Sequence, residues 1–107
     1  MQYDLDLKSE NKALFLSARK LLMSFEGIAE LKKERITTYS NDKSGICHMR
    51  TMPHGIDIGF LKGVQMEDKY KRLTGTGKVM RILPLSSFDK TIVTYYVKQA
   101  IQINALK

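Results

Sequence analysis

Residues 55–85 read GIDIGFLKGVQMEDKYKRLTGTGKVMRILPL, and this stretch decides the fold. Two apolar segments, residues 56–62 and 79–83, flank a basic connection that contains three glycines. Short apolar runs rich in branched and aromatic side chains and bounded by glycine or proline are typical of strands. The stretch therefore predicts two strands joined by a loop over residues 63–77.

Two more strands are predicted upstream of this stretch. Residues 35–40 contain isoleucine, threonine and tyrosine, which favour strands, and residues 46–52 lie between turn clusters at 41–45 and 53–55. Short turns of this kind join antiparallel strands, so we expect all four strands to pair in that way.

Apolar residues recur at helical spacing near both ends of the chain. The first stripe covers residues 14–29, and a helical turn through Lys33 is expected to follow it. The second stripe covers residues 92–101 and follows Ser86 and Asp89, which have the spacing of a capping box. We therefore predict one helix at each end.

The chain has 107 residues, of which 43% are hydrophobic, and this suits one domain with its own core. Two helices with apolar stripes must cover one face of the sheet. The element order thus predicts a single α+β domain over residues 1–107. We expect this domain to be a two-layer sandwich in which a four-stranded antiparallel sheet carries the N- and C-terminal helices on one face.

Strand alternation sorts the side chains into two faces. Ile56, Ile58 and Phe60 share one face and are expected to meet the helices. The uncovered face is expected to carry a mixture of charged and apolar side chains, His48, Arg50, Asp57, Leu61 and Arg81, with Tyr39 as a further candidate. Antiparallel sheets often leave one face in water, so this face is our candidate ligand or partner surface. The alternative is a solvated face with a local Arg–Asp pair, since exposed ion pairs are common and weak.

The formal net charge is +7, and it is unevenly distributed. Residues 1–30 hold four Lys or Arg against five Asp or Glu, whereas residues 31–107 hold fourteen against six. A basic half attracts phosphate, nucleic acid or an acidic protein face, or it only keeps the protein in solution.

The GTGK segment at residues 75–78 invites a phosphate-binding interpretation. It is not a P-loop, because that motif needs glycine where Arg72 stands and Ser or Thr where Val79 stands. Its backbone amides are candidates for an anion-binding nest beside Lys78. Glycines that only permit a positive φ in a turn are the alternative.

Cys47 and His48 are neighbours on a predicted strand, so their side chains point to opposite faces and cannot grip one metal ion. His54 alone does not complete a zinc set. No nucleophile, base and orienting group can be assembled, so we expect no enzymatic activity. The nine aromatic residues are expected mainly in the core, not interleaved with basic residues as in a single-strand nucleic-acid platform.

One cysteine in the whole chain suits a reducing compartment. Residues 1–6 carry acids where a secretion signal needs a basic start and an apolar run. No apolar stretch approaches the ~20 residues of a membrane span. We therefore expect a cytoplasmic protein that makes no membrane contact.

Three motifs carry a family resemblance. The chain reads T-Y-S at residues 38–40, G-F-L-K-G at 59–63 and L-T-G-T-G-K-V-M-R at 73–81, followed by a closing helix. In this order and spacing, residues 38–100 resemble the YdhG-like family of small bacterial proteins. The resemblance implies a frataxin-like α/β sandwich, and because some members are iron chaperones it also implies iron as a candidate cargo. In this chain, however, the acidic residues are scattered among lysines, whereas weak surface binding of iron needs clustered negative charge.

The sequence thus predicts a non-enzymatic cytoplasmic binding module without a cofactor, with iron implied by the resemblance alone. We expect it to bind an acidic protein face or an anionic ligand. Electrostatic binding of nucleic acid is the alternative. The candidate binding residues are His48, Arg50, Asp57, Lys62, Gly75, Gly77, Lys78 and Arg81.

Overall fold

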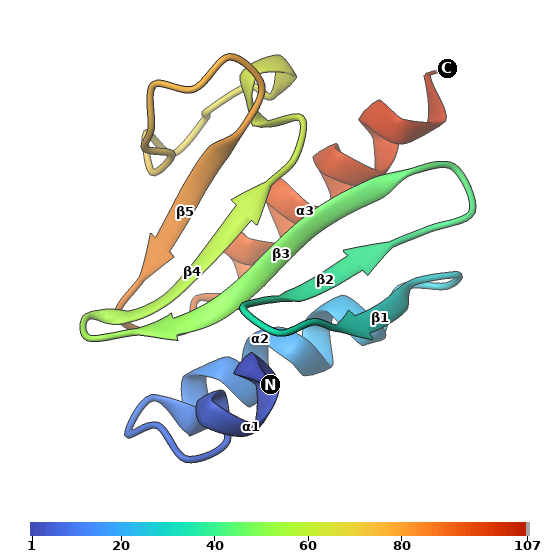
Figure 1. Cartoon of the computed structure of the whole chain (residues 1–107). Helices are drawn as coiled ribbons and strands as arrows, with labels where there is room; N and C mark the ends of the chain where they lie inside the picture. The colour runs from blue at the N-terminus through green and yellow to red at the C-terminus, as the bar shows by residue number, and fades with distance from the viewer. Residues whose placement is uncertain (107) are drawn as a thin grey trace.

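A computed structural model describes residues 1–106 as one five-stranded sheet with helices before and after it (Figure 1). In chain order the elements are α1 (Gln2–Asp6), α2 (Lys12–Met23), β1 (Ala29–Lys32), β2 (Thr37–Ser40), β3 (Gly45–Met52), β4 (Gly55–Phe60), the 3₁₀ turn η1 (Gly63–Gln65), β5 (Arg81–Leu85) and α3 (Lys90–Ala105). The strands pair antiparallel in the order β1-β2-β3-β4-β5, so each strand lies beside its neighbour in sequence.

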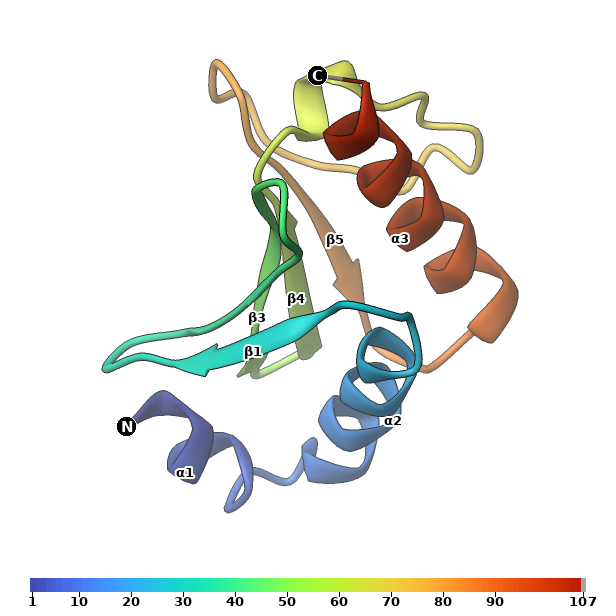
Figure 2. The same cartoon turned by 90° about the vertical axis from the view of Figure 1, so that its right-hand side faces the viewer.

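Helices α2 and α3 pack on the same side of the sheet. Figure 2 shows both helices on one side of the strands, whereas α1 lies near one end of them. The core between the two layers contains these large buried side chains: Phe15, Leu22, Tyr39, Met49, Ile58, Phe60, Leu83, Val93 and Tyr96. The arrangement confirms the α+β class with one antiparallel sheet and a helix packed from each end of the chain.

The prediction of four strands is wrong by one. A helical continuation was expected where the structure has β1, Ala29–Lys32. Helix α2 ends at Met23, and Gly27 takes a φ of +79°, which turns the chain out of its helical path. The chain then runs back along β2, with Glu30 opposite Tyr39.

The side-chain faces of β3 and β4 follow the prediction. Ile56, Ile58 and Phe60 are completely buried under the helices. On the other side of the sheet, His48 is partly exposed and Arg50 is exposed. The period-two pattern of these strands therefore identified the covered face correctly.

The side-chain faces of β5 differ from the prediction, which placed Arg81 on the uncovered side. Leu83 is completely buried and pairs with Ile58, whereas Ile82 is partly exposed. Arg81 pairs with Phe60, so alternation places it on the covered side of the sheet. The expected position of Arg81 was therefore wrong.

The starts of the helices also differ from the prediction. Helix α1 is an additional element that the apolar spacing did not indicate, and α2, which begins at Lys12 and ends at Met23, carries only the first part of the predicted stripe. Asp89 caps α3, because its side chain accepts a hydrogen bond from the backbone N–H of Ile92 at 3.2 Å. Ser86 is therefore not the N-cap residue.

Candidate binding surface on the sheet

The side of the sheet opposite α2 and α3 extends across all five strands (Figure 1). The strand register aligns the side chains of this surface in two cross-strand rows. The first row is Leu31, Thr38, His48, Gly59 and Ile82, and the second is Arg50, Asp57 and Pro84. We call this surface the open face.

His48 packs directly over Gly59 on the neighbouring strand. A Cβ atom at Gly59 would touch Cε1 of His48 and would lie only 2.9 Å from its Nδ1. Real Cβ atoms do not approach a ring so closely, so glycine is the residue that leaves room for the imidazole. The ring therefore lies against the backbone of β4 near the centre of the sheet.

The surroundings of His48 keep its imidazole uncharged. Burial of the ring, followed by the charge of Arg50, lowers the pKa of His48, although Asp57 acts in the opposite direction. Because the ordinary pKa of histidine is about 6.5, a lowered pKa leaves the ring neutral at pH 7. A neutral imidazole offers an apolar ring with one N–H donor and one acceptor nitrogen.

Strand alternation predicted Arg50 and Asp57 on one face, and the register adds that they lie opposite each other. The local ion pair that was the alternative is not formed within residues 1–106, and Oδ1 of Asp57 instead lies 2.9 Å from Nε2 of His54. Arg50 is exposed and forms no ion pair with any residue between 1 and 106. The open face thus carries an unpaired guanidinium beside a neutral imidazole.

Two of the predicted binding residues point away from the open face. Nζ of Lys62 donates a hydrogen bond to Oδ1 of the buried Asn104 on α3 at 2.7 Å. Nη1 of Arg81 donates to the backbone oxygens of Gly77 at 2.6 Å and Met80 at 2.7 Å. These two side chains fasten the ends of the connection between β4 and β5, so they do not extend the open face.

The GTGK segment forms an exposed part of the same connection. Gly75 has a φ of +114°, a conformation that favours glycine, so this glycine permits a backbone conformation that other residues rarely adopt. Gly77 turns its carbonyl oxygen, not its amide, toward Arg81. Lys78 is exposed and forms no ion pair within the part of the chain that the structure describes. The anion-binding nest stays a prediction, with Lys78 as its one exposed cation.

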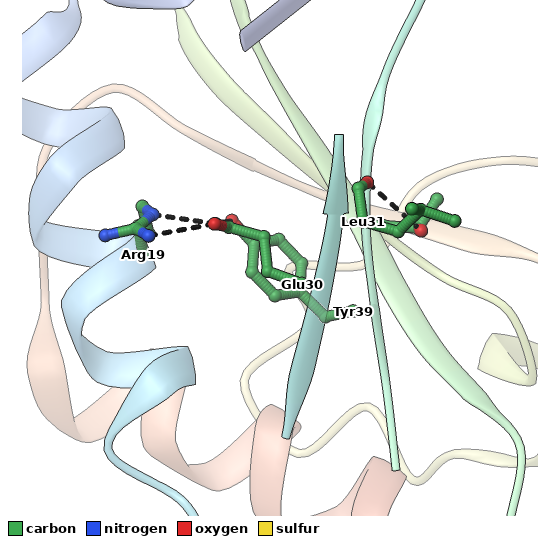
Figure 3. Close-up of polar contacts among 5 residues, drawn as sticks. Arg19, Glu30, Leu31 and Tyr39 are labelled. Atoms are coloured by element: carbon green, nitrogen blue, oxygen red, sulfur yellow. Dashed lines mark hydrogen bonds and ion pairs between the residues drawn. The ribbon is translucent and has the colours of Figure 1, made fainter. Parts of the chain in front are cut away.

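A polar cluster that the sequence did not reveal fastens β1 to the rest of the molecule (Figure 3). Arg19 of α2 donates two hydrogen bonds to the carboxylate of Glu30, at 2.7 and 2.8 Å, and the Tyr39 hydroxyl donates a third at 2.8 Å. The side chain of Glu30 is only 7% exposed. Charge-assisted bonds of this kind are strong, so the cluster ties β1 to α2 and β2 and fixes one edge of the open face.

The same cluster shifts the pKa of each member. Burial alone would raise the pKa of Glu30, but the hydrogen bonds from Arg19 and Tyr39 outweigh burial and lower it. Burial, and then the bond to Glu30, raises the pKa of Tyr39, and the bond to Glu30 raises the pKa of Arg19. At neutral pH the carboxylate is therefore ionised and the phenol neutral, which is the state that these hydrogen bonds require.

Cys47 is completely buried, and burial raises the pKa of its thiol. A buried neutral thiol behaves as a small hydrophobic side chain and reacts poorly. Within residues 1–106, no three His, Cys, Asp or Glu side chains are placed to hold one metal ion.

Comparison with protein-family models, with curated proteins and with solved structures finds no match to this chain. The resemblance to the YdhG-like family therefore stays a prediction that rests on the three motifs. Among residues 1–106, none of the helices is long and apolar enough to cross a membrane.

Proposed function

We propose that this chain is a non-enzymatic binding module whose open face docks an acidic segment of a partner protein. One observation carries the proposal: the unpaired guanidinium of Arg50 lies beside His48 on a sheet face that no helix covers. A guanidinium presents a planar fork of N–H donors that matches a carboxylate. A cytoplasmic location belongs to the same proposal, because the only cysteine is a free thiol.

Charge favours an acidic occupant of the open face. Lys33, just after β1, contributes to the lowered pKa of His48, so its positive charge reaches the same surface. The opposing carboxylate, Asp57, has one oxygen hydrogen-bonded to His54, and its single negative charge faces the two positive charges of Arg50 and Lys33. The net charge of +7 also attracts an acidic partner before contact, and this attraction is screened beyond about 8 Å at physiological salt.

A short polyglutamate peptide is the probe for this proposal, and ¹H–¹⁵N NMR spectra show where it binds. We expect shift changes at the amides of Thr38, His48 and Arg50, and weaker binding as the salt concentration rises. The Arg50→Glu variant should lose binding. The Lys43→Glu variant makes the same change of charge in the exposed β2–β3 turn and should keep most of it.

Equal losses in the Glu variants of Arg50 and Lys43 would show that only net charge matters and would contradict the proposal. Shift changes confined to other surfaces of the molecule would contradict it as well. Arg50→Lys keeps the charge but removes the planar fork, so we expect this variant to bind more weakly than the parent protein.

Iron delivery is the version of this function that the YdhG-like resemblance implies. Calorimetric titration with ferrous iron under anaerobic conditions tests iron delivery. The absence of saturable iron binding would contradict this hypothesis. Docking of an acidic segment does not depend on the outcome, because it requires only Arg50 and its surroundings.

A further inference from the structure

The connection between β4 and β5 folds onto α3, on the opposite side of the molecule from the open face (Figure 2). The backbone oxygen of Glu67 accepts hydrogen bonds from the Tyr95 hydroxyl at 2.8 Å and from Nε2 of Gln99 at 3.1 Å. The hydroxyl of Tyr96 donates to the Asp68 carboxylate. Side chains of α3 thus hold residues 67 and 68 in place.

This attachment brings Tyr70 of the connection against Tyr95 and Tyr96, which are neighbours on α3. The ring of Tyr70 meets the ring of Tyr95 edge to face, with centroids 5.3 Å apart, and Tyr95 meets Tyr96 at 5.0 Å. Tyr96 is buried against Phe60, whereas Tyr70 and Tyr95 are only partly buried. The cluster therefore runs from the core to the surface and ends in two partly exposed aromatic rings.

Four cations lie in the same region: Lys69, Lys71 and Arg72 flank Tyr70 in sequence, and Lys98 lines a hollow together with Tyr95. All four are exposed, and none forms an ion pair within the described chain. Nζ of Lys69 lies 5.4 Å from the centroid of Tyr70 and 5.7 Å from that of Tyr95. A cation–π contact at an exposed site is weak, about 0.5–1 kcal/mol, so a ligand can displace this ammonium from the rings.

The acids of this region oppose the cations only in part. Burial would raise the pKa of Asp68, but hydrogen bonds from Tyr96 and from the backbone N–H groups of Arg72 and Leu73 outweigh burial and lower it. Asp68 is therefore ionised, and its carboxylate oxygens already accept hydrogen bonds from these donors. Glu67 is exposed and is the remaining carboxylate of the region.

A shallow hollow of about 320 Å³ lies beside Tyr95. It is lined by Glu67, Tyr95, Lys98, Gln99 and Gln102. Its size is near the lower end of ordinary ligand pockets, roughly 300–1,000 Å³. The side-chain amide of Gln102 has no hydrogen-bond partner in residues 1–106, so it can form a hydrogen bond with the edge of a base placed there.

We propose that this surface binds single-stranded nucleic acid, with bases against Tyr70 and Tyr95 and phosphates beside Lys69, Lys71, Arg72 and Lys98. Partly exposed aromatic rings among unpaired cations are the two features that single-strand recognition combines. A duplex hides its base faces, and an acidic peptide has no planar group to stack on the rings. The inference is independent of the acidic partner proposed for the open face.

Fluorescence anisotropy with a labelled single-stranded oligothymidine tests the proposal. For four phosphate contacts, the logarithm of the binding constant should fall with the logarithm of salt concentration with a slope of about −3. The triple variant Lys69→Gln/Lys71→Gln/Lys98→Gln should bind far more weakly and show a slope of about −1. The matched control Lys12→Gln/Lys20→Gln/Lys43→Gln removes the same charge from exposed positions elsewhere and should keep most of the affinity.

Stacking is tested separately from charge. Tyr70→Leu keeps an apolar side chain but loses the aromatic ring, and we expect roughly five- to a hundredfold weaker binding for one lost stacked base. Glu67→Gln should strengthen binding, because it removes the remaining carboxylate of the hollow. Circular dichroism and the thermal midpoint of each variant confirm that it is folded.

Equal losses of affinity in the two triple variants would overturn the proposal, and so would duplex DNA that binds as tightly as the single strand. A third contradicting result would be that polyglutamate displaces the oligonucleotide from Tyr70→Leu as well as it does from the parent protein. Oligouridine of the same length distinguishes RNA from DNA, and tight binding of either one supports the inference. Arg50→Glu should leave oligothymidine binding largely intact, so failure on one surface can be separated from failure on the other.

Discussion

Replacing Gly59 by alanine tests the packing of His48 on the open face. The added Cβ would occupy the space of the imidazole, touching Cε1 and lying 2.9 Å from Nδ1 and 3.0 Å from Nε2. Overpacking costs about 1–3 kcal/mol, whereas alanine in a strand interior gains about 0.5–1 kcal/mol over glycine. Because the ring can swing toward solvent, we expect a net loss of about 1–2 kcal/mol in the free energy of unfolding.

Thermal and urea unfolding measure this loss, which corresponds to a fall of about 5–10 °C in the melting temperature for a domain of this size. The displaced ring also becomes more exposed, so the pKa of His48 should rise toward its ordinary value of about 6.5, which NMR titration of the ring protons reports. In a His48→Ala background the Gly59→Ala change should be neutral or slightly stabilising. A double-mutant cycle isolates this coupling.

Gly77→Ala is the matched control, because Gly77 has no positive φ and its added Cβ would meet nothing closer than 3.8 Å. We expect it to change the free energy of unfolding by less than about 0.5 kcal/mol. If Gly59→Ala were as stable as Gly77→Ala, and the titration of His48 were unchanged, the inferred packing of the ring would be refuted.

Three further predictions concern buried groups. Arg19→Met leaves the carboxylate of Glu30 without its main partner, so unfolding in urea should show a loss of about 2 kcal/mol, while Lys20→Met, one residue away and exposed, should change little. The pKa of Glu30 is lower in the folded than in the unfolded chain, so its stabilising effect is present above about pH 4.3 and is lost as the pH falls. Urea midpoints should therefore drop between about pH 4.3 and pH 3, and Glu30→Gln should flatten this drop; an unchanged profile would count against the cluster. Finally, Cys47 should resist a thiol reagent at pH 8 until the protein is unfolded, and rapid labelling of the native protein would contradict its burial.

Strand alternation predicted the centre of the sheet because its signal there is clear. In β4 the positions of Ile56, Ile58 and Phe60 alternate with Asp57 and Gly59, and only one choice of face buries the apolar set. The neighbouring register then brings His48 and Arg50 beside Asp57. That part of the candidate surface could therefore be read from the sequence.

The errors occurred where the local pattern was weak. The residues of β1, Ala-Glu-Leu-Lys, all favour helices over strands, so its strand conformation depends on pairing with β2 and on the bonds from Arg19 and Tyr39 to Glu30. The run from Val79 to Leu83 contains four apolar residues, and such a run has no alternation from which to choose a face.

The tyrosine-rich surface on α3 could not be predicted from the sequence for a different reason. Tyr70 and Tyr95 are separated by a long loop, a strand and a turn, and only the folded connection brings their rings together. The aromatic residues were expected mainly in the core, whereas Tyr70 and Tyr95 are only partly buried and Lys69 lies over both rings. Long cationic side chains such as Lys62 and Arg81 can reach either side of a strand end, so their positions also depended on tertiary contacts.

The strands lie in the sheet in the same order as in the chain, and this order affects how the protein folds. The first three connections, residues 33–36, 41–44 and 53–54, are short, so closing each hairpin restricts little chain and can occur quickly. The connection that follows, residues 61–80, is much longer, and α3 comes after it. A nascent chain that stops before residue 90 would thus hold paired strands whose apolar side is covered by α2 but not by α3. We expect chaperones and proteases to recognise this protein at that stage, before its C-terminal helix docks.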